Sequence, residues 1–561
     1  MMQLTVTVAA AVLFSLGPGE CMGRHIERQE ILITPEGKAK RCSPTLRGLS
    51  INVTELIARR QVGLKQTNVI STGHIDPHEF YAGRKIEAIT SKAPIFNPTI
   101  MQADRHRFDQ AEIEPGLQLK TAFAGLDDTQ YAPPDCQMAS GPDHIMVVVN
   151  GSWAVFDKAG RQLLRRNFAD LFESLAENAS IYKPRVVYDH FRGGWLMATC
   201  AMSNEQAQTR KQAWFFLAAS HGPDPLGDWW VWAIDTRSDE SQPNLNPDAL
   251  GLAVDATSVY LTANMFAGRG QFAYARLRVL SKSDLQVGGM LHSWDFWHLK
   301  NFDGTPGFGI QPALNMRAPE GQFMVNATAD GQSLTLWKVS QRPRQAPTLT
   351  RKSIPTTHYG LAPNVRQPKI EREIETGDTR LCQVVYRHGQ LWAAHSIAVN
   401  WGDGQNFAGI QWFQINTKAG FVTQQGIFGA PGYHYFCPAV MVDQAGNMIM
   451  VFNRVSESDP LAICYSGKFA NDEPNRLRDS VELLQSSMAG ASEWSSSSAA
   501  AIGPEEGTLW IMGQYVATAS DWATWIGAVN SIEGSGIGGS GIGGSGTETP
   551  DAPESTNQPG Q

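Results

Sequence analysis

The stretch that decides the fold is residues 220–266, SHGPDPLGDWWVWAIDTRSDESQPNLNPDALGLAVDATSVYLTANMF. An apolar strand is expected to end at Ser220, residues 222–227 predict a turn, and a tryptophan-rich strand follows over 229–234. Two more strands, 250–254 and 259–264, flank a tight turn at 255–258. Short strands separated by Gly, Pro and Asp turns are typical of stacked antiparallel sheets. The stretch therefore predicts an all-β fold.

The same alternation of short strands and turns recurs along the chain. Asn150-Gly151, for example, is a strong hairpin signal between two apolar strands. Sets of strands start near residues 136, 184, 250, 311, 382, 437 and 496. A repeat of about 50–70 residues with several strands per unit predicts a β-propeller, whose blades bury their faces against one another. The starts predict seven blades, and the variable loop lengths also allow six or eight.

Composition supports a large folded protein and excludes some partners. Of the 561 residues, 42% are apolar and 9% aromatic, which is ample for a core. The formal net charge is −8 and no Lys/Arg block interrupts it, so no nucleic-acid partner is expected. The seven cysteines form no CxxC motif or Cys/His cluster, so no metal site is expected from them. Buried thiols and disulfides both remain open.

The two ends of the chain differ from the repeats. An apolar run from Leu4 to Leu16, followed by Gly-Pro-Gly, predicts a signal peptide over residues 1–22 and hence a secreted, extracellular or periplasmic protein; a buried strand is the alternative. No segment reaches the roughly 18 apolar residues of a membrane span. Residues 23–120 are expected to form an N-terminal arm or small cap, either with a helix within 46–66 or extended along the main domain. Residues 121–530 hold the propeller, and 531–561 form a flexible Gly/Ser-rich and Pro/acidic tail, expected to be disordered.

The quoted stretch resembles a group of secreted bacterial β-propeller proteins, within the sialidase-like propeller superfamily in the broad sense. The features in common are a DPxGxW turn before an aromatic strand (224–229), YD…GW (188–195), LWAAH (391–395), VDQAGN (442–447) and WATWI (522–526). The resemblance covers about residues 120–530 and implies the fold and a secreted setting, but no common reaction. Lys183-Pro184 and Trp494-Ser495 stand where acidic residues are usual in the group. This departure disfavours a cation site at the blade mouths.

Candidate binding residues come from the loops that enter the innermost strands. In a propeller these loops line the mouth of the central channel, where a ligand would be met. Mixed charges, an aromatic ring and a histidine converging there could hold a glycan or another polar ligand. Solvated residues and strand caps would give the same pattern. The predicted ligand-binding residues are Lys183, Arg185, Asp248, Gln311, Arg380, His434, Tyr435 and Trp494.

Three functions remain open from the sequence. The first is a non-enzymatic scaffold that binds a glycan, a surface component or a protein. The second is a polysaccharide hydrolase or lyase with acid and base groups drawn from Asp135, Asp248 and His434. The third is a structural surface-coat component, with the tail as a spacer. No nucleophile elbow, zincin, P-loop or dinucleotide motif is found, and the Asp-boxes of sialidases are missing.

No cofactor is expected. A calcium ion would need several oxygen ligands from a tight loop, and Asp224, Asp228 and Asp235 are the nearest candidates. However, Asp at the first position and Gly at the fourth already explain residues 224–227 as a turn. The turn is the favoured interpretation.

Overall fold

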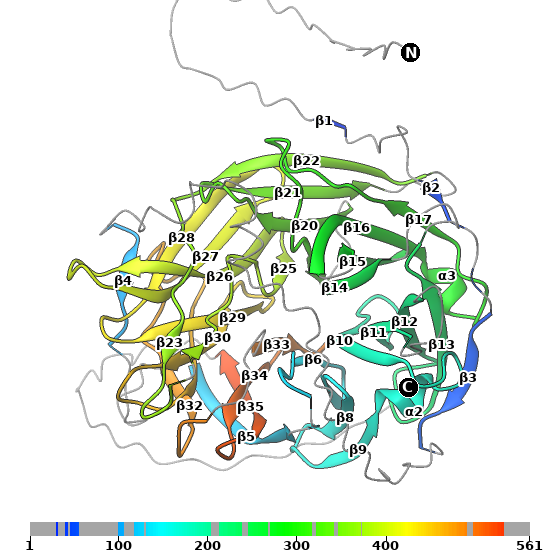
Figure 1. Cartoon of the computed structure of the whole chain (residues 1–561), viewed down its shortest axis with the longest axis horizontal. Coiled ribbons are helices and arrows are strands. Elements are labelled where there is room, and N and C mark those ends of the chain that lie inside the picture. The colour runs from blue at the N-terminus through cyan, green and yellow to red at the C-terminus, as the bar shows by residue number, and fades with distance from the viewer. Residues whose placement is uncertain are drawn as a thin grey trace, which may run out of the picture.

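The computed structural model describes residues 30–31, 40–42, 45, 47–54, 99–105, 117–127, 129, 131–203, 212–237, 245–267, 270–316, 321–340, 346–371, 373–490 and 498–531. Among these residues the fold is all-β, as predicted, with two short helices, α2 (Phe168–Phe172) and α3 (Lys282–Leu285). Seven sheets contain four to six strands, and an eighth pairs only β23 (Val365–Arg366) with β24 (Glu373–Ile374). The larger sheets stand around a common centre, consistent with a β-propeller (Figure 1).

Each large sheet is built mainly from strands that follow one another in the chain and pair antiparallel. We number these sheets in chain order of their innermost strands. The first sheet contains β6 (Gln137–Ser140), β7 (His144–Val149), β8 (Ser152–Asp157) and β9 (Gln162–Asn167). The second contains β10 (Ser180–Tyr188), β11 (Trp195–Met202), β12 (Ala213–Ser220) and β13 (Asp228–Asp235). The third contains β14 (Asn246–Val254), β15 (Ser258–Ala267), β16 (Gln271–Ser281) and β17 (Ser293–Phe296).

The remaining sheets repeat this order. The fourth contains β18 (Gln311–Pro312), β20 (Gln322–Ala327), β21 (Ser333–Ser340) and β22 (Thr348–Pro355). The fifth contains β25 (Val384–Arg387), β26 (Gln390–Asn400), β27 (Asn406–Asn416) and β28 (Phe421–Gly429), with β19 (Leu314–Asn315) parallel to β25. The sixth contains β29 (His434–Val442), β30 (Met448–Val455), β31 (Ala462–Lys468) and β32 (Val481–Gln485). The seventh contains β33 (Ser498–Ile502), β34 (Leu509–Val516), β35 (Trp522–Ser531) and β5 (Leu117–Asp127).

Every predicted repeat start lies within four residues of the first residue of an innermost strand. The agreement arises because each innermost strand is a short apolar run preceded by a polar loop. We call the end at which the innermost strands begin the mouth face, and the end at which they finish the rear face.

The N-terminal arm supplies outer strands to several sheets. β1 (Glu30–Ile31) pairs with β22, β2 (Lys40–Arg41) with β17, β3 (Leu49–Asn52) with β13, and β4 (Met101–Ala103) with β28. Added strands of this kind occupy exposed sheet edges that could otherwise pair with another chain. The helix expected within 46–66 is wrong where β3 lies, and its part beyond Thr54 falls outside the described residues. The predicted signal peptide and most of the predicted tail also lie outside them.

The hydrophobic core lies between neighbouring sheets. Trp153 and Trp229 pack between the first and second sheets, with ring centroids 6.3 Å apart. Trp232 packs with Leu252 between the second and third sheets. All four side chains are at most 5% exposed. Because each interface is filled by large side chains from both sheets, no sheet buries its faces alone, as expected of propeller blades.

The turn of the opening stretch has a structural role. Asp224 Oδ1 accepts a hydrogen bond from Leu226 N (2.9 Å), and the Pro225 carbonyl accepts one from the Trp229 indole (3.0 Å). The Pro223 carbonyl accepts another from the Trp195 indole (2.8 Å). The turn thus positions two core tryptophans of the second sheet.

Neither of the two described helices is long enough to cross a membrane. Within the described ranges no two cysteines are joined by a disulfide. Cys200 and Cys464 are fully buried inside the sheets, and burial raises the pKa of both thiols.

Candidate binding site at the channel mouth

Three of the innermost strands share a backbone kink near the mouth face. In β10, β14 and β29 the register shifts at Tyr182/Arg185, Asp248/Gly251 and Phe436/Ala439. Within each shift one residue has a positive φ, namely Lys183 (55°), Ala249 (49°) and Cys437 (52°). Bulges of this kind bend a strand and redirect its side chains, at a cost of about 1–2 kcal/mol for a left-handed non-glycine residue.

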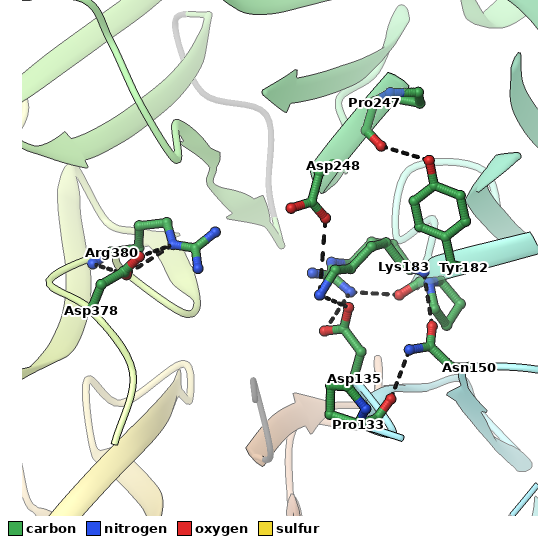
Figure 2. A network of polar contacts seen from close by, with 11 residues as sticks. Pro133, Asp135, Asn150, Tyr182, Lys183, Pro247, Asp248, Asp378 and Arg380 are labelled. Atoms are coloured by element: carbon green, nitrogen blue, oxygen red, sulfur yellow. Dashed lines mark hydrogen bonds and ion pairs between the residues drawn. The ribbon is translucent and has the colours of Figure 1, made fainter. Parts of the chain in front are cut away.

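Four charged side chains from three sheets meet at this kink. Asp135, also left-handed (φ 50°), precedes β6, and its carboxylate lies 3.0 Å from Lys183 Nζ and 3.4 Å from Arg185 Nη1. Lys183 Nζ in turn lies 4.0 Å from Asp248 Oδ1. Figure 2 shows Lys183 between the two carboxylates. Asp135 is only 1% exposed, whereas the other three side chains are 12–20% exposed. The cluster therefore has a buried centre and a partly open rim.

Asn150 fixes the backbone that presents this cluster. Its Nδ2 donates to the Pro133 carbonyl (2.8 Å), and its Oδ1 accepts from Lys183 N (2.9 Å). Its own backbone N donates to the Pro134 carbonyl (2.7 Å). The Asn-Gly hairpin of the first sheet thus joins the loop before Asp135 to the strand that holds Lys183.

A fifth charged group, from the fifth sheet, faces the cluster. The guanidinium of Arg380 points toward the side on which Lys183 and Asp248 lie (Figure 2). Its Nε donates to Asp378 Oδ1 (2.8 Å), and its guanidinium lies 5.5 Å from the centre of the Phe308 ring. The Arg380 side chain is 30% exposed and Asp378 is 3% exposed. Arg380 is therefore anchored at one end and open at the other.

The electrostatics hold the cluster in its charged form. Burial alone would raise the pKa of Asp135, but Lys183 and Arg185 hold it below its ordinary value. Burial would likewise lower the pKa of Lys183, and Asp135 and Asp248 raise it instead. A carboxylate ionised in this way accepts hydrogen bonds but does not supply a proton near neutral pH.

The other predicted residues lie apart from this cluster. Gln311 begins β18 and is partly exposed. His434 Nδ1 accepts from Ala408 N (3.2 Å) beside the Phe407 ring, and burial lowers its pKa to about 4. Tyr435 is fully buried, and its hydroxyl donates to Asp104 Oδ2 (2.9 Å), an arrangement that favours a structural role. Trp494 lies outside the described residues.

Two of the three calcium candidates are engaged elsewhere, and the third, Asp228, is exposed at the start of β13. Asp224 closes its turn, and Asp235 forms a 2.7 Å ion pair with Arg237. In the described part of the chain, no three His, Cys, Asp or Glu side chains are grouped as metal ligands.

Sequence reasoning missed several residues that organise the mouth. The sequence marks Asn150 only as a turn residue, and Asp378 precedes its strand like any loop carboxylate. Gln383 reaches from the fifth sheet to the Val440 and Ala500 carbonyls (2.7 and 2.9 Å) and so bridges three innermost strands. No pattern in the chain marks these residues, because each acts on a sheet distant in sequence.

No family model matches the chain, and no curated protein matches it. Solved structures give distant matches to β-propeller proteins. An α-L-arabinanase from Penicillium chrysogenum complexed with arabinobiose is 10% identical over 73% of this chain and 98% of that chain (TM-score 0.34). A sialidase from Trypanosoma rangeli in complex with sialic acid is 11% identical over 72% of this chain (TM-score 0.32). A quinohemoprotein alcohol dehydrogenase from Comamonas testosteroni is 10% identical over 69% of this chain (TM-score 0.32).

The chain spans 59% of that sialidase and 66% of that dehydrogenase. At these identities and TM-scores the matches support no argument about activity. The propeller arrangement rests on the strand pairings described above.

Proposed function

We propose that this chain is a secreted seven-bladed β-propeller that binds a polar, hydroxyl-rich ligand such as a glycan at its mouth face. Each of the seven large sheets would be one blade, and β5 would close the ring. The supporting observation is the convergence of five charged side chains from four sheets, namely Asp135, Lys183, Arg185, Asp248 and Arg380.

The mixture of charges suits a neutral polyol. Sugar hydroxyls donate to carboxylates such as Asp248 and accept from guanidinium groups such as Arg380, and one hydroxyl can do both. Because acids and bases are interleaved, the mouth offers both kinds of partner without a large net charge. Secretion rests on the apolar N-terminal run alone.

The pKa values of two of the predicted acid–base residues favour binding over catalysis. A glycosidase pairs an ionised carboxylate with a protonated one of raised pKa. The pKa of Asp135 is lowered instead, and His434 is enclosed between the fifth and sixth sheets. Neither Asp135 nor His434 is therefore placed to supply a proton at the mouth, whereas Asp248 and Arg380 are placed to accept and donate hydrogen bonds.

The test is glycan retention by the immobilised full chain, using wild type, Arg380→Gln and the matched control Arg366→Gln. Arg366 is an exposed arginine, 3.5 Å from an exposed Glu373. Because hydrogen bonds to charged groups contribute about 1.5–3 kcal/mol, Arg380→Gln should weaken binding about tenfold or more and Arg366→Gln should not. Equal affinity of all three proteins, or no retained glycan, would refute the proposal. Cleavage of a polysaccharide that Asp248→Asn abolishes would establish an enzyme instead.

A further inference from the structure

A pocket lies on the rear face, between the fifth and sixth sheets. It is lined by the β25–β26 turn, by β26, β27 and β28, and by the ends of β29 and β31. Its volume is about 120 Å³, of the same order as the ~150 Å³ of a closed engineered cavity that holds benzene, and the pocket is partly open to solvent. The lining residues used below are Arg387, His388, Gln390, Trp392, Gln424 and Lys468.

Lys468 is the unusual member of this lining. The residue is 1% exposed, and its Nζ donates to Gln424 Oε1 (2.6 Å) and lies 5.9 Å from the centre of the Trp412 ring. Within the described residues no carboxylate lies within the 4.0 Å of an ion pair with it. The nearby Asp472 is held by Arg478 in a two-point contact of 2.8 and 2.7 Å. A buried ammonium with one uncharged acceptor has two donors left to satisfy.

Two other sheets provide an internal comparison. Lys158 and Lys282, like Lys468, stand at the end of the third strand of their sheets. Lys158 Nζ lies 2.9 Å from Glu505 and Lys282 Nζ lies 2.6 Å from Asp189, and each acid belongs to the preceding sheet. Lys468 is the member of this set without such an acid.

In the fifth sheet, which precedes the sheet of Lys468, a cation occupies the position that corresponds to Asp189 in the second sheet. Asp189 directly follows the innermost strand of the second sheet, whereas Arg387 ends the innermost strand of the fifth. The Arg387 guanidinium is itself neutralised by Glu506, with both oxygens at 2.8 Å. Of the lysine and arginine side chains that line the pocket, Lys468 is therefore the one without a carboxylate within ion-pair distance in the described part of the chain.

The remaining lining suits a hydroxylated ring. The Gln390 side chain is partly exposed, and its amide offers donors and an acceptor. His388 is exposed, and its Nε2 lies 3.0 Å from the Gln444 carbonyl, which fixes Nε2 as the donor and leaves Nδ1 as an acceptor. Trp392 provides apolar surface for a ring face.

We infer that this rear-face pocket binds an oxyanion, a carboxylate or sulfate, carried on a sugar-sized ring, with Lys468 as the counter-ion. The anionic group of the ligand would form an ion pair with the buried ammonium, as Glu505 does with Lys158 and Asp189 with Lys282. Burial lowers the pKa of Lys468, as expected of an ammonium without an adjacent carboxylate. This site is separate from the mouth and does not depend on the function proposed for it.

The test titrates the full chain with glucuronate, glucose and inorganic sulfate, measured by calorimetry or ligand-observed NMR. Wild type should bind glucuronate and not glucose, and Lys468→Met should lose at least tenfold in affinity. Lys158→Met, the same substitution in the first sheet, should bind like wild type, and so should the mouth variant Arg380→Gln. Gln390→Leu, a change at a partly exposed position, should also weaken binding if Lys468→Met proves poorly folded.

Some results would overturn the inference. These are undiminished glucuronate binding in both Lys468→Met and Gln390→Leu, loss of binding in Arg380→Gln alone, or no binding by wild type. Binding of sulfate without glucuronate would refute the sugar ring as its carrier. The urea midpoint gives a second readout, because Lys468→Met removes a poorly compensated buried charge and should leave stability unchanged or higher. A purely structural Lys468 would instead lower it.

Discussion

Lys183→Met should destabilise the protein because it leaves Asp135 buried beside only one cation. The Asp135 side chain is 1% exposed, with Lys183 at 3.0 Å and Arg185 at 3.4 Å. Breaking a buried ion pair costs about 3–5 kcal/mol, and Arg185 offsets part of it, so we expect a loss of about 3 kcal/mol at pH 7. Methionine keeps the unbranched stem and pays the same cost as lysine at positive φ.

The loss should depend on pH with a defined sign. In wild type the pKa of Asp135 is lowered, so its contribution to stability is present above the unfolded pKa of about 3.9 and is lost as pH falls through the folded pKa. In the variant burial is less opposed and the pKa of Asp135 should rise, so its carboxyl becomes protonated at mildly acidic pH. The stability that accompanies the raised pKa of Lys183 is fully present below about pH 10.4 and is lost only as pH rises beyond it, so it does not vary between pH 3.5 and 7. The difference between the two proteins should therefore shrink at least by half at about pH 3.5.

The assay is urea unfolding followed by tryptophan fluorescence at both pH values. The matched control is Lys158→Met, whose pair with Glu505 is 25% and 40% exposed and should contribute about 0–1 kcal/mol. The double variant Lys183→Met/Asp135→Asn should recover part of the loss, because the fully buried charge is then gone and the charges that lose a partner, Arg185 and Asp248, are 12% and 20% exposed. An equal loss at both pH values, or a loss no larger than that of Lys158→Met, would refute the reasoning.

Two further predictions concern the core. Asp295→Asn should lower the free energy of unfolding in urea by about 3–5 kcal/mol, because fully buried Asp295 binds Arg278 at 2.7 Å through both oxygens and lies 3.5 Å from Arg276. The control Glu373→Gln, at an exposed ion pair, should change stability little, and an equally small change for Asp295→Asn would contradict the expected role. Cys200 and Cys464 should react with a disulfide reagent at pH 8 at least about 100-fold more slowly in the native protein than in urea, since burial raises the pKa of both thiols, to about 12 for Cys464. Mass spectrometry locates the labelled thiol, and fast labelling of either one in the native protein would show that the strands open.

The ring of sheets was predictable because its signals are local. Asn150-Gly151 and the turn at Asp224 specify hairpins within a few residues, and the apolar run in each repeat marks an innermost strand. The arm strands were not predictable. A two-residue strand such as Lys40–Arg41 has no periodicity, and it is a strand only because β17 offers an edge.

The candidate site shows the same division. The mouth positions of Lys183, Arg185, Asp248 and Arg380 follow from the repeat starts alone. Their pairing does not, because it depends on a left-handed Lys183 and on Asn150 from another sheet. Tyr435 shows the reverse problem, since a residue next to the strand start can turn inward and hydrogen-bond to Asp104 of the arm.

The pairing of β5 with β35 constrains how the chain can be assembled during synthesis. Leu117 emerges from the ribosome about 400 residues before its partner Ser531, a delay of roughly 20–80 s at 5–20 residues per second. Until then β5 lacks β35, the strand with which it pairs. Its alternation of exposed and half-buried residues, with Lys120 among them, makes it a poor template for aggregation while it waits. The synthesis of β35, the last strand that the structure describes, therefore determines when β5 can join its sheet.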